Sequence, residues 1–352
     1  MARLLTFKSA VNEALSTAME RDKSVICYGL GTDDPKGVFG TTLSLKKRFG
    51  PKRVFDMPTS ENAMTGVAIG ASLNGIRPVM THQRLDFFLL ALDQLINNAA
   101  KWHYMFGGLA SIPITIRLLI GRGWGQGPTH SQNLQAVFAH IPGLKVVMPS
   151  NAADAKGLLL SSIFDDNPVI FIEHRWLYNT ESDVLEGDVR IPIGKAQKLK
   201  TGKDITLVSI SYMTIEALHA MEFLEEQGVS CDLIDLRSIK PIDYEMIFES
   251  VRKTGRLMAI DTGVRTCSVA GEIIASVCEK HFDSISAPPV RLTQPDVPTP
   301  TSPALTKFFY KRAEDIVNAA GSLLGKKFDV SSITKRRDFP HDVPGDWFKG
   351  PF

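Results

Sequence analysis

The chain has 352 residues, of which 44% are hydrophobic and 22% are charged, and its formal net charge is +2. These values are typical of a soluble globular protein with enough chain for two domains, and they argue against a nucleic-acid or other polyanionic partner. No apolar run reaches about 18 residues, and the N-terminus lacks the apolar core of a signal peptide, so we expect no membrane span and a cytoplasmic protein.

Cysteine usage agrees with a reducing compartment. Cys27, Cys231, Cys267 and Cys278 lie far apart, with no C-x-x-C spacing. Neither a disulfide framework nor a zinc site is expected.

Strands and helices alternate along the first half of the chain, which predicts a parallel sheet with helices on both faces. Thr6 is the expected cap of the first helix. In chain order we expect a helix to about 20, a strand over 24–28, a helix over 42–48, a strand over 53–56, a helix from 61, a strand over 77–81, a helix over 86–104, a strand over 112–119, a glycine-rich loop over 121–132, a helix to 140, a strand over 144–148, a helix over 152–163 and a strand over 169–173.

A polar linker over 179–189 precedes a second α/β unit. Its expected elements are strands over 204–210, 231–236, 257–261 and 290–292, and helices over 213–227, 244–252, 270–280 and 308–323. The tail from Lys326 has no periodic pattern, so we expect it along the surface, on a neighbouring subunit, or disordered. The fold class is α/β with two parallel-sheet, three-layer domains over 1–180 and 190–325, followed by an extended tail over 326–352.

Glu61 marks the most informative stretch. Pro58 ends a strand, Thr59 and Ser60 can cap the helix that follows, and Glu61 lies in the first helical turn. This position is just past the carboxyl end of a strand, where ligands bind in open α/β sheets. The alternative is an acidic residue that only complements the helix dipole. Gly66 and Gly70 share one helix face, which another helix could approach closely.

Several stretches together resemble the beta subunit of the thiamine-diphosphate-dependent 2-oxo acid dehydrogenases of the pyruvate and branched-chain type. Each is weak alone, but the ordered set is specific and covers about residues 6–323. The stretches are FDMPTSE over 55–61, GVAIGA over 66–71, DQLINNAAK over 93–101, HSQ over 130–132, PGLKVV over 142–147, DAKGLL over 154–159, DDNPV over 165–169 and DLRSIKP over 235–241.

The resemblance implies a pyrimidine-binding domain followed by a transketolase C-terminal-type domain. The family's diphosphate and Mg²⁺ site contains Gly-Asp-Gly, which this sequence lacks. The resemblance therefore implies that a separate alpha subunit holds the diphosphate and Mg²⁺ of thiamine diphosphate. An α2β2 heterotetramer follows, with the Gly66/Gly70 face packed against its symmetry mate.

The same resemblance assigns roles to individual residues. Glu61 would hydrogen-bond the aminopyrimidine ring, Phe87 would pack beside that ring, and Gln83 would lie next to the cofactor. His130 would orient substrate or donate a hydrogen bond to developing charge. The alternatives are a histidine with only local contacts in a polar loop, and a phenylalanine in ordinary helix core. Trp102, Tyr104, Met105 and Phe106 are assigned to the core or to a subunit interface.

Two segments depart from the family pattern, His82-Gln83-Arg84 and the loop over 121–128. Arg84, Arg122 and Trp124 could line a pocket for a substrate with an anionic or polar group, or lie at the surface or an interface. In some family members, backbone carbonyls hold a structural K⁺, and the matching positions here are Ile114, Ser162, Ile163, Asp165 and Asn167. The alternative is a helix end and tight turn without an ion.

Three functions stay open. The first is decarboxylation of a 2-oxo acid with transfer of the acyl unit to the lipoyl domain of an acyltransferase. The second is a two-subunit transketolase- or acyloin-type enzyme whose acceptor is an aldehyde. The third is a non-catalytic scaffold subunit.

Overall fold

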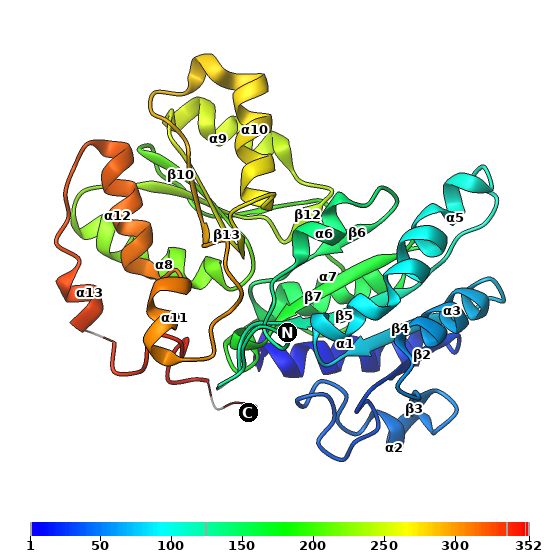
Figure 1. Cartoon of the computed structure of the whole chain (residues 1–352). Helices are drawn as coiled ribbons and strands as arrows, with labels where there is room; N and C mark the ends of the chain where they lie inside the picture. Colours follow the sequence, from blue (N-terminus) through cyan, green and yellow to red (C-terminus); the bar gives the residue numbers. More distant parts are fainter. Residues whose placement is uncertain (1, 124, 336, 349, 351–352) are drawn as a thin grey trace. The chain divides into compact units, whose positions relative to one another are not determined.

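A computed structural model describes residues 2–123, 125–335, 337–348 and 350. The chain forms two compact units (Figure 1). Unit 1 contains the described residues of 1–124, 129–193 and 349–352, and unit 2 contains those of 125–128 and 194–348. Both are α/β units with mainly parallel sheets, so the predicted fold class is confirmed.

The sheet of unit 1 has the strand order β6-β7-β5-β4-β2-β3, and its paired strands are parallel. All residues of β5 and β7 are buried, as expected for strands covered on both faces. The elements of unit 1 are β1 (Ala2–Thr6), α1 (Phe7–Arg21), β2 (Val25–Gly29), α2 (Leu45–Phe49), β3 (Val54–Asp56), α3 (Glu61–Ser72), β4 (Arg77–His82), α4 (Leu85–Phe88), η1 (Leu89–Ala91), η2 (Gln94–Ala99), α5 (Ala100–Met105), β5 (Thr115–Ile120), α6 (Gln135–His140), β6 (Lys145–Val147), α7 (Ala152–Ile163), β7 (Val169–His174), η3 (Arg175–Leu177) and β8 (Glu181–Leu185).

The assignment of 179–189 as a linker was wrong, because β8 pairs antiparallel with β1 over Ala2–Thr6. Val184 is the one residue of β8 that is buried, and it packs with Ala10 and Ala152. A strand with a single buried side chain has no alternating apolar pattern, so its sequence looks like a polar loop.

The helix expected over 86–104 is a succession of different helical forms. α4 is followed by the 3-10 turn η1, the π-helix η2 and then α5. Gln94 of η2 lies against Gly66 of α3, where an added Cβ would be 3.5 Å from its Oε1 atom. The apolar spacing is too similar among these forms for periodicity to separate them.

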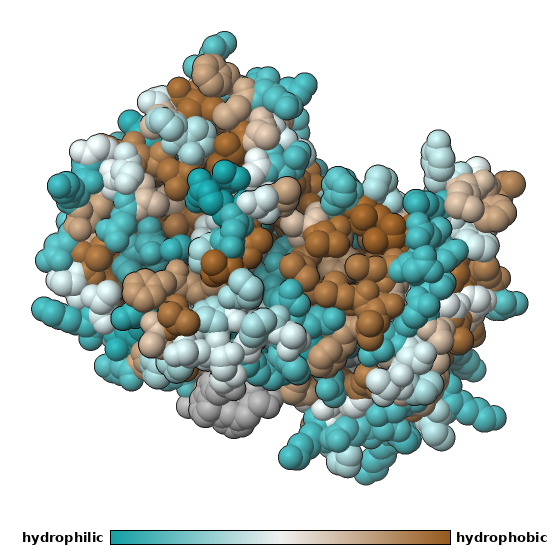
Figure 2. All heavy atoms as spheres, viewed as in Figure 1, coloured by the Kyte–Doolittle hydropathy of each residue, from teal (hydrophilic) through white to brown (hydrophobic). Residues whose placement is uncertain are grey.

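The end of α5 carries exposed apolar side chains, so the core alternative for this segment was wrong for Tyr104, Met105 and Phe106. Leu109, just beyond them, is 94% exposed. Figure 2 shows the apolar surface at this end of the helix. None of the helices in the part of the chain that the structure describes combines the length and the apolar character of a membrane span.

The sheet of unit 2 has the order β14-β13-β10-β11-β9, in which β9 alone of these strands runs antiparallel to its neighbour. Its elements are β9 (Gln197–Lys200), β10 (Ile205–Ser209), α8 (Met213–Glu226), β11 (Cys231–Asp235), β12 (Ser238–Lys240), α9 (Tyr244–Thr254), β13 (Leu257–Val264), α10 (Val269–His281), η4 (Phe282–Ser284), β14 (Val290–Gln294), α11 (Pro303–Phe309), α12 (Ala313–Leu324) and α13 (Ser331–Lys335). The sequence predicted one helix over 308–323, but α11 and α12 are separate, since Arg312 is extended and caps α12.

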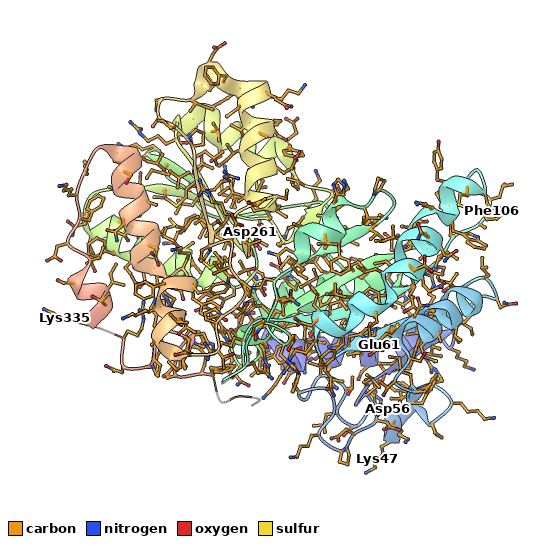
Figure 3. All side chains as sticks on the ribbon, in the orientation of Figure 1. Lys47, Asp56, Glu61, Phe106, Asp261 and Lys335 are labelled. Atoms are coloured by element: carbon orange, nitrogen blue, oxygen red, sulfur yellow. The ribbon has the colours of Figure 1, made fainter. Side chains whose placement is uncertain are left out.

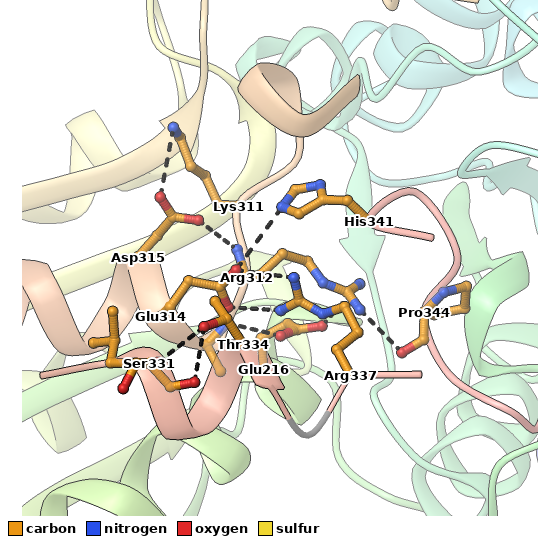
Figure 4. Close-up of polar contacts among 12 residues, drawn as sticks. Glu216, Lys311, Arg312, Glu314, Asp315, Ser331, Thr334, Arg337, His341 and Pro344 are labelled. Carbon is orange, nitrogen blue, oxygen red and sulfur yellow. Dashed lines mark hydrogen bonds and ion pairs between the residues drawn. The ribbon is translucent and has the colours of Figure 1, made fainter. Parts of the chain in front are cut away.

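Arg312 also ties the tail to unit 2 (Figure 4). Its guanidinium donates to the Tyr212 hydroxyl at 2.8 Å and lies 3.0 Å from Glu216 Oε1. A second nitrogen donates to the carbonyls of Val343 and Pro344, each at 3.2 Å. The side chain is buried, so these contacts fix the tail on α8 and α12.

A second ion pair supports this attachment. The two terminal nitrogens of Arg337 donate to the two carboxylate oxygens of Glu314 at 2.9 and 2.6 Å. His341 Nε2 lies 4.0 Å from the same carboxylate. Such a bidentate geometry is the strong form of an arginine–carboxylate contact.

Replacing Arg312 by methionine should lower the free energy of unfolding by about 3–5 kcal/mol, because the buried Glu216 carboxylate loses its cation. Urea-induced unfolding of the full chain measures this change. The matched control is Lys311→Met, because the ammonium of Lys311 comes no closer than 4.0 Å to the Asp315 carboxylate and the side chain is partly exposed. This substitution should change the free energy of unfolding by less than about 1 kcal/mol. Equal effects of the two substitutions would contradict the role given to Arg312.

Candidate functional site

The carboxyl edge of the unit 1 sheet is built around Asp56 and Glu61, which Figure 3 shows at the end of β3 and the start of α3. The Asp56 carboxylate accepts hydrogen bonds from the backbone N–H groups of Gly31 and Asp33, both at 3.1 Å. It thereby holds the loop that follows β2 against the edge of the sheet.

Glu61 is the first residue of α3 and is only 5% exposed. Within the described part of the chain, its carboxylate makes no hydrogen bond or ion pair. The expected cap is wrong in detail, because Ser60 is at the cap position but its side chain makes no capping bond. A carboxylate that has no partner within the described part of the protein is an available acceptor, so this group is suited to a ligand that donates a hydrogen bond.

Phe87 and His130 come together as neighbours. Their rings meet edge to face, with centroids 5.5 Å apart and planes at 90°. The segment around His130 is anchored to α4, because Gln132 Nε2 donates to Asp86 Oδ1 at 2.7 Å. His130 is exposed, and its Nδ1 lies 2.9 Å from the Thr129 hydroxyl. The imidazole is therefore held beside an aromatic ring yet open to a ligand.

Gln83 lies against the loop after β2. A Cβ at Gly31 would overlap its Nε2 atom, and Gly31 has a φ of +74°. Only glycine satisfies both the close approach and this backbone conformation without strain. The loop after β2 therefore packs closely on the side chain of the residue that follows β4.

Two buried guanidiniums stack on Phe39. The guanidinium Cζ atoms of Arg84 and Arg175 lie 5.4 and 5.0 Å from the centroid of the Phe39 ring. Burial and, second to it, the neighbouring charge of Arg84 together lower the pKa of Arg175 to about 9. Arg122 is also buried, and its carbonyl accepts a 2.7 Å hydrogen bond from Trp176. The predicted pocket residue Trp124 lies outside the described residues.

A buried ion pair between Arg117 of β5 and Glu173 of β7 lies behind this edge. Arg117 Nε and a terminal nitrogen donate to the two oxygens of Glu173 at 2.6 and 3.0 Å. The guanidinium also donates to the hydroxyls of Thr41 and Thr81 at 2.9 and 3.3 Å, and the Tyr178 hydroxyl donates to Glu173 at 2.8 Å. Sequence reasoning missed this network, although a charged residue inside each of two apolar strands was a visible signal.

His82 ends β4 and is 1% exposed. Neither ring nitrogen has a hydrogen-bond partner among the described residues. Burial lowers the pKa of this imidazole to about 3, so it is neutral at physiological pH. Phe88 packs against it edge-on, with ring centroids 4.8 Å apart.

Two of the five carbonyls assigned to K⁺ already accept hydrogen bonds from a cation of the protein. Arg77 donates to the carbonyls of Ile163 and Asp165 at 3.3 and 3.0 Å. The carbonyl of Ile114 accepts from Val169 N–H at 3.0 Å, and Asn167 N–H donates to the Asp165 carboxylate at 2.9 Å. The carbonyl of Ser162 accepts from the N–H groups of residues 164 and 165. In the described part of the chain, no cluster of three histidine, cysteine or acidic side chains could hold a metal ion.

Comparison with known proteins places this geometry in a family. The pyrimidine-binding domain of transketolase matches residues 4–181, and the transketolase C-terminal domain matches residues 194–316. The beta subunit of acetoin:2,6-dichlorophenolindophenol oxidoreductase from Cupriavidus necator is 41% identical over 91% of this chain and 97% of its own length. The pyruvate dehydrogenase E1 component subunit beta from Rickettsia bellii is 40% identical over 90% and 97%.

The chain belongs to the family of beta subunits of thiamine-diphosphate-dependent 2-oxo acid and acetoin dehydrogenases. The family resemblance drawn from the sequence motifs is thus confirmed. A solved split-gene transketolase, described as an inactive beta4 tetramer, has the same fold, with a TM-score of 0.75 and 24% identity over 92% of this chain and 99% of its own. Because the relatives are beta subunits, the family implies an alpha-subunit partner.

Acid should destabilise unit 1 through its buried histidines. The folded-state pKa values of His82 and His174 are both about 3, against about 6.5 in the unfolded chain. The unfolded state therefore binds more protons between these values, and stability is full above about pH 6.5 and falls as the pH drops towards 3. Each histidine should contribute a loss of about 2 kcal/mol between pH 7 and pH 5.

Urea unfolding at pH 7, 6 and 5 measures this dependence. His82→Phe should remove about 2 kcal/mol of the total loss, whereas His219→Phe, at an exposed position of α8, should leave it unchanged. A pH-independent stability over this range would show that the two imidazoles are not neutral and buried as described.

Proposed function

We propose that this chain is the beta subunit of an α2β2 enzyme that decarboxylates a 2-oxo acid and passes the acyl unit to the lipoyl domain of an acyltransferase. The observation that carries the proposal is the carboxylate of Glu61, which has no partner within the described residues. The residue is 5% exposed and begins α3 at the carboxyl edge of the sheet, where ligands bind in such folds. The relatives named pyruvate dehydrogenase beta subunits support this reaction class.

The residues on this edge suit the pyrimidine end of thiamine diphosphate. Glu61 offers an acceptor without a partner among the described residues, Phe87 offers an apolar ring next to His130, and Gln83 offers an amide. When bound, the cofactor supplies an electron sink at the carbonyl carbon of the substrate. The chain lacks Gly-Asp-Gly, so an alpha subunit would hold the diphosphate and Mg²⁺.

His130 would act on the substrate. Its ring is held edge-on by Phe87, and its exposed imidazole can donate a hydrogen bond to an oxygen that gains negative charge. The anchoring of Gln132 to Asp86 limits how far this loop can move from the edge. We therefore assign His130 to orienting the substrate and stabilising the charge that develops on it.

Arg84, Arg122 and Trp124 remain the proposed substrate pocket. The guanidiniums of Arg84 and Arg175 flank one aromatic ring, which concentrates positive charge where a substrate carboxylate would be favoured. Structural K⁺ at the carbonyls of residues 114, 162, 163, 165 and 167 also remains a proposal. Arg77 would then share the Ile163 and Asp165 carbonyls with the ion.

The exposed apolar end of α5 is the proposed subunit interface. Met105, Phe106 and Leu109 form it, and burying them against a partner would be favourable. Gly66 is already covered in part by Gln94, whereas a Cβ at Gly70 would meet open space. Of the two glycines, Gly70 is the one better placed to admit a neighbouring helix.

A second candidate function is acyloin chemistry with an aldehyde as the other substrate or product. It is favoured by the two relatives named acetoin:2,6-dichlorophenolindophenol oxidoreductase subunit beta, from Cupriavidus necator and Bacillus subtilis, which are 41% and 40% identical. Both functions use Glu61 and His130. They differ in the acceptor, which is a lipoyl domain in one case and an aldehyde in the other.

Replacing Glu61 by glutamine should lower kcat of the complex with the alpha subunit by about a hundredfold or more, because the neutral amide cannot replace the carboxylate acceptor. The measurement is 2-oxo acid-dependent reduction of an artificial electron acceptor in the presence of thiamine diphosphate and Mg²⁺. The matched control is Glu222→Gln, an exposed position on α8, which should retain full activity. Full activity of Glu61→Gln would refute the role of this residue, and inactivity of the unmodified complex would favour the scaffold function.

A further inference from the structure

The imidazole of His82 is buried in a way that ordinary core packing does not explain. A neutral imidazole offers one N–H donor and one nitrogen acceptor. Both nitrogens of His82 lack a partner among the described residues, although the ring is 1% exposed. Buried polar groups are nearly always hydrogen-bonded, so a fully unpaired imidazole calls for a bound group.

The position and orientation of the ring are fixed. His82 is the last residue of β4, and Phe88 of α4 packs on its ring edge. Thr65 lies one turn after Glu61 in α3. Its hydroxyl is 3.5 Å from the sulfur atom of Met80 in β4. His82 thus ends the strand that α3 packs on, next to Gln83 of the proposed cofactor site.

Other buried oxygens without a partner lie on the neighbouring segments of this edge. They are the Thr32 hydroxyl, Asp86 Oδ2 and the Ser131 hydroxyl, each unbonded within residues 2–123 and 125–335. A Cβ atom added to Gly29 would lie 3.0 Å from the Thr32 hydroxyl and would overlap the carbonyl of Thr81. The Thr32 hydroxyl is therefore close to Thr81, the residue before His82. Asp86 is in α4, and its other oxygen holds Gln132, which follows Ser131.

The chemistry of this set favours a neutral group. A neutral imidazole and two hydroxyls can donate to and accept from a hydroxyl or carbonyl oxygen. The free carboxylate oxygen of Asp86 would repel an anion but would accept from a hydroxyl. A substrate carboxylate is better served by the arginines around Phe39.

We propose that His82 determines substrate specificity by hydrogen-bonding a neutral hydroxyl or carbonyl oxygen on the substrate chain beyond the reacting carbonyl. The inference rests on the proposed function and adds the class of substrate to it. The enzyme should therefore prefer a hydroxylated 2-oxo acid to its aliphatic analogue, because an analogue without the hydroxyl leaves the buried polar groups unpaired.

The test compares hydroxypyruvate with pyruvate, which differ by one hydroxyl group, in the full complex with the alpha subunit. The kcat/KM of the unmodified complex should favour hydroxypyruvate by about tenfold or more. His82→Phe should abolish this preference, mainly through KM for hydroxypyruvate, and His82→Gln should restore part of it. The matched control His219→Phe should leave the preference unchanged.

Two further readouts separate specificity from a structural role. His82→Phe should raise the midpoint of thermal unfolding, because it removes two unpaired buried nitrogens from an apolar contact with Phe88. Calorimetric binding of thiamine diphosphate to the complex should be unchanged. A lower unfolding midpoint with an unchanged preference would show that His82 only stabilises the fold.

The outcomes also separate this inference from the proposed function. Equal kcat/KM for both 2-oxo acids, or an unchanged preference in His82→Phe, would overturn the inference. The proposed function would still stand in that case, provided that turnover depended on Glu61. If the complex bound thiamine diphosphate but turned over no 2-oxo acid, the proposed function would fail and the inference with it. Turnover of other 2-oxo acids but of neither of these two would overturn the inference alone.

Discussion

The buried ion pair between Arg117 and Glu173 fixes the sheet edge on which the candidate site is built. It links β5 to β7, and its remaining hydrogen bonds reach Thr81 in β4 and Thr41 in the segment after β2. Removing one partner would leave an uncompensated buried charge, at a cost of about 3–5 kcal/mol. Charge-assisted hydrogen bonds therefore hold together β5, β7, β4 and the segment after β2, near the carboxyl ends of β4 and β7.

The carboxyl edge of the same sheet differs from this ion pair, because it carries polar groups without partners in the described part of the chain. Arg117 and Glu173 satisfy each other. In contrast, the imidazole of His82 and the hydroxyls of Thr32 and Ser131 are buried without hydrogen-bond partners among the described residues. A folded chain normally satisfies such groups. Their concentration on the ligand-binding edge of one sheet indicates that unit 1 is preorganised to donate to and accept from a bound molecule.

Much of this arrangement could be predicted from residue patterns. The helix capped by Thr6, the buried strands and the position of Glu61 at the start of α3 followed from caps, apolar runs and Pro58. The pairing of β1 with β8 could not be predicted, since only Val184 of β8 is buried and its other side chains carry no apolar alternation. Arg117 and Glu173 are 56 residues apart in sequence. The pairing of these two charges therefore cannot be predicted from the residues around either one. The absence of hydrogen-bond partners for the two nitrogens of His82 is likewise a property of the folded environment.

If this chain carries half of a thiamine diphosphate site, as proposed, it should bind the cofactor only together with the alpha subunit. Calorimetric titration of thiamine diphosphate with Mg²⁺ into the chain alone, and then into its complex with the alpha subunit, measures this directly. We predict binding only with the partner present, because the chain offers acceptors for the pyrimidine but has no Gly-Asp-Gly motif for the diphosphate. Tight binding to the isolated chain would contradict the shared site, and no binding to either would contradict a cofactor role for Glu61.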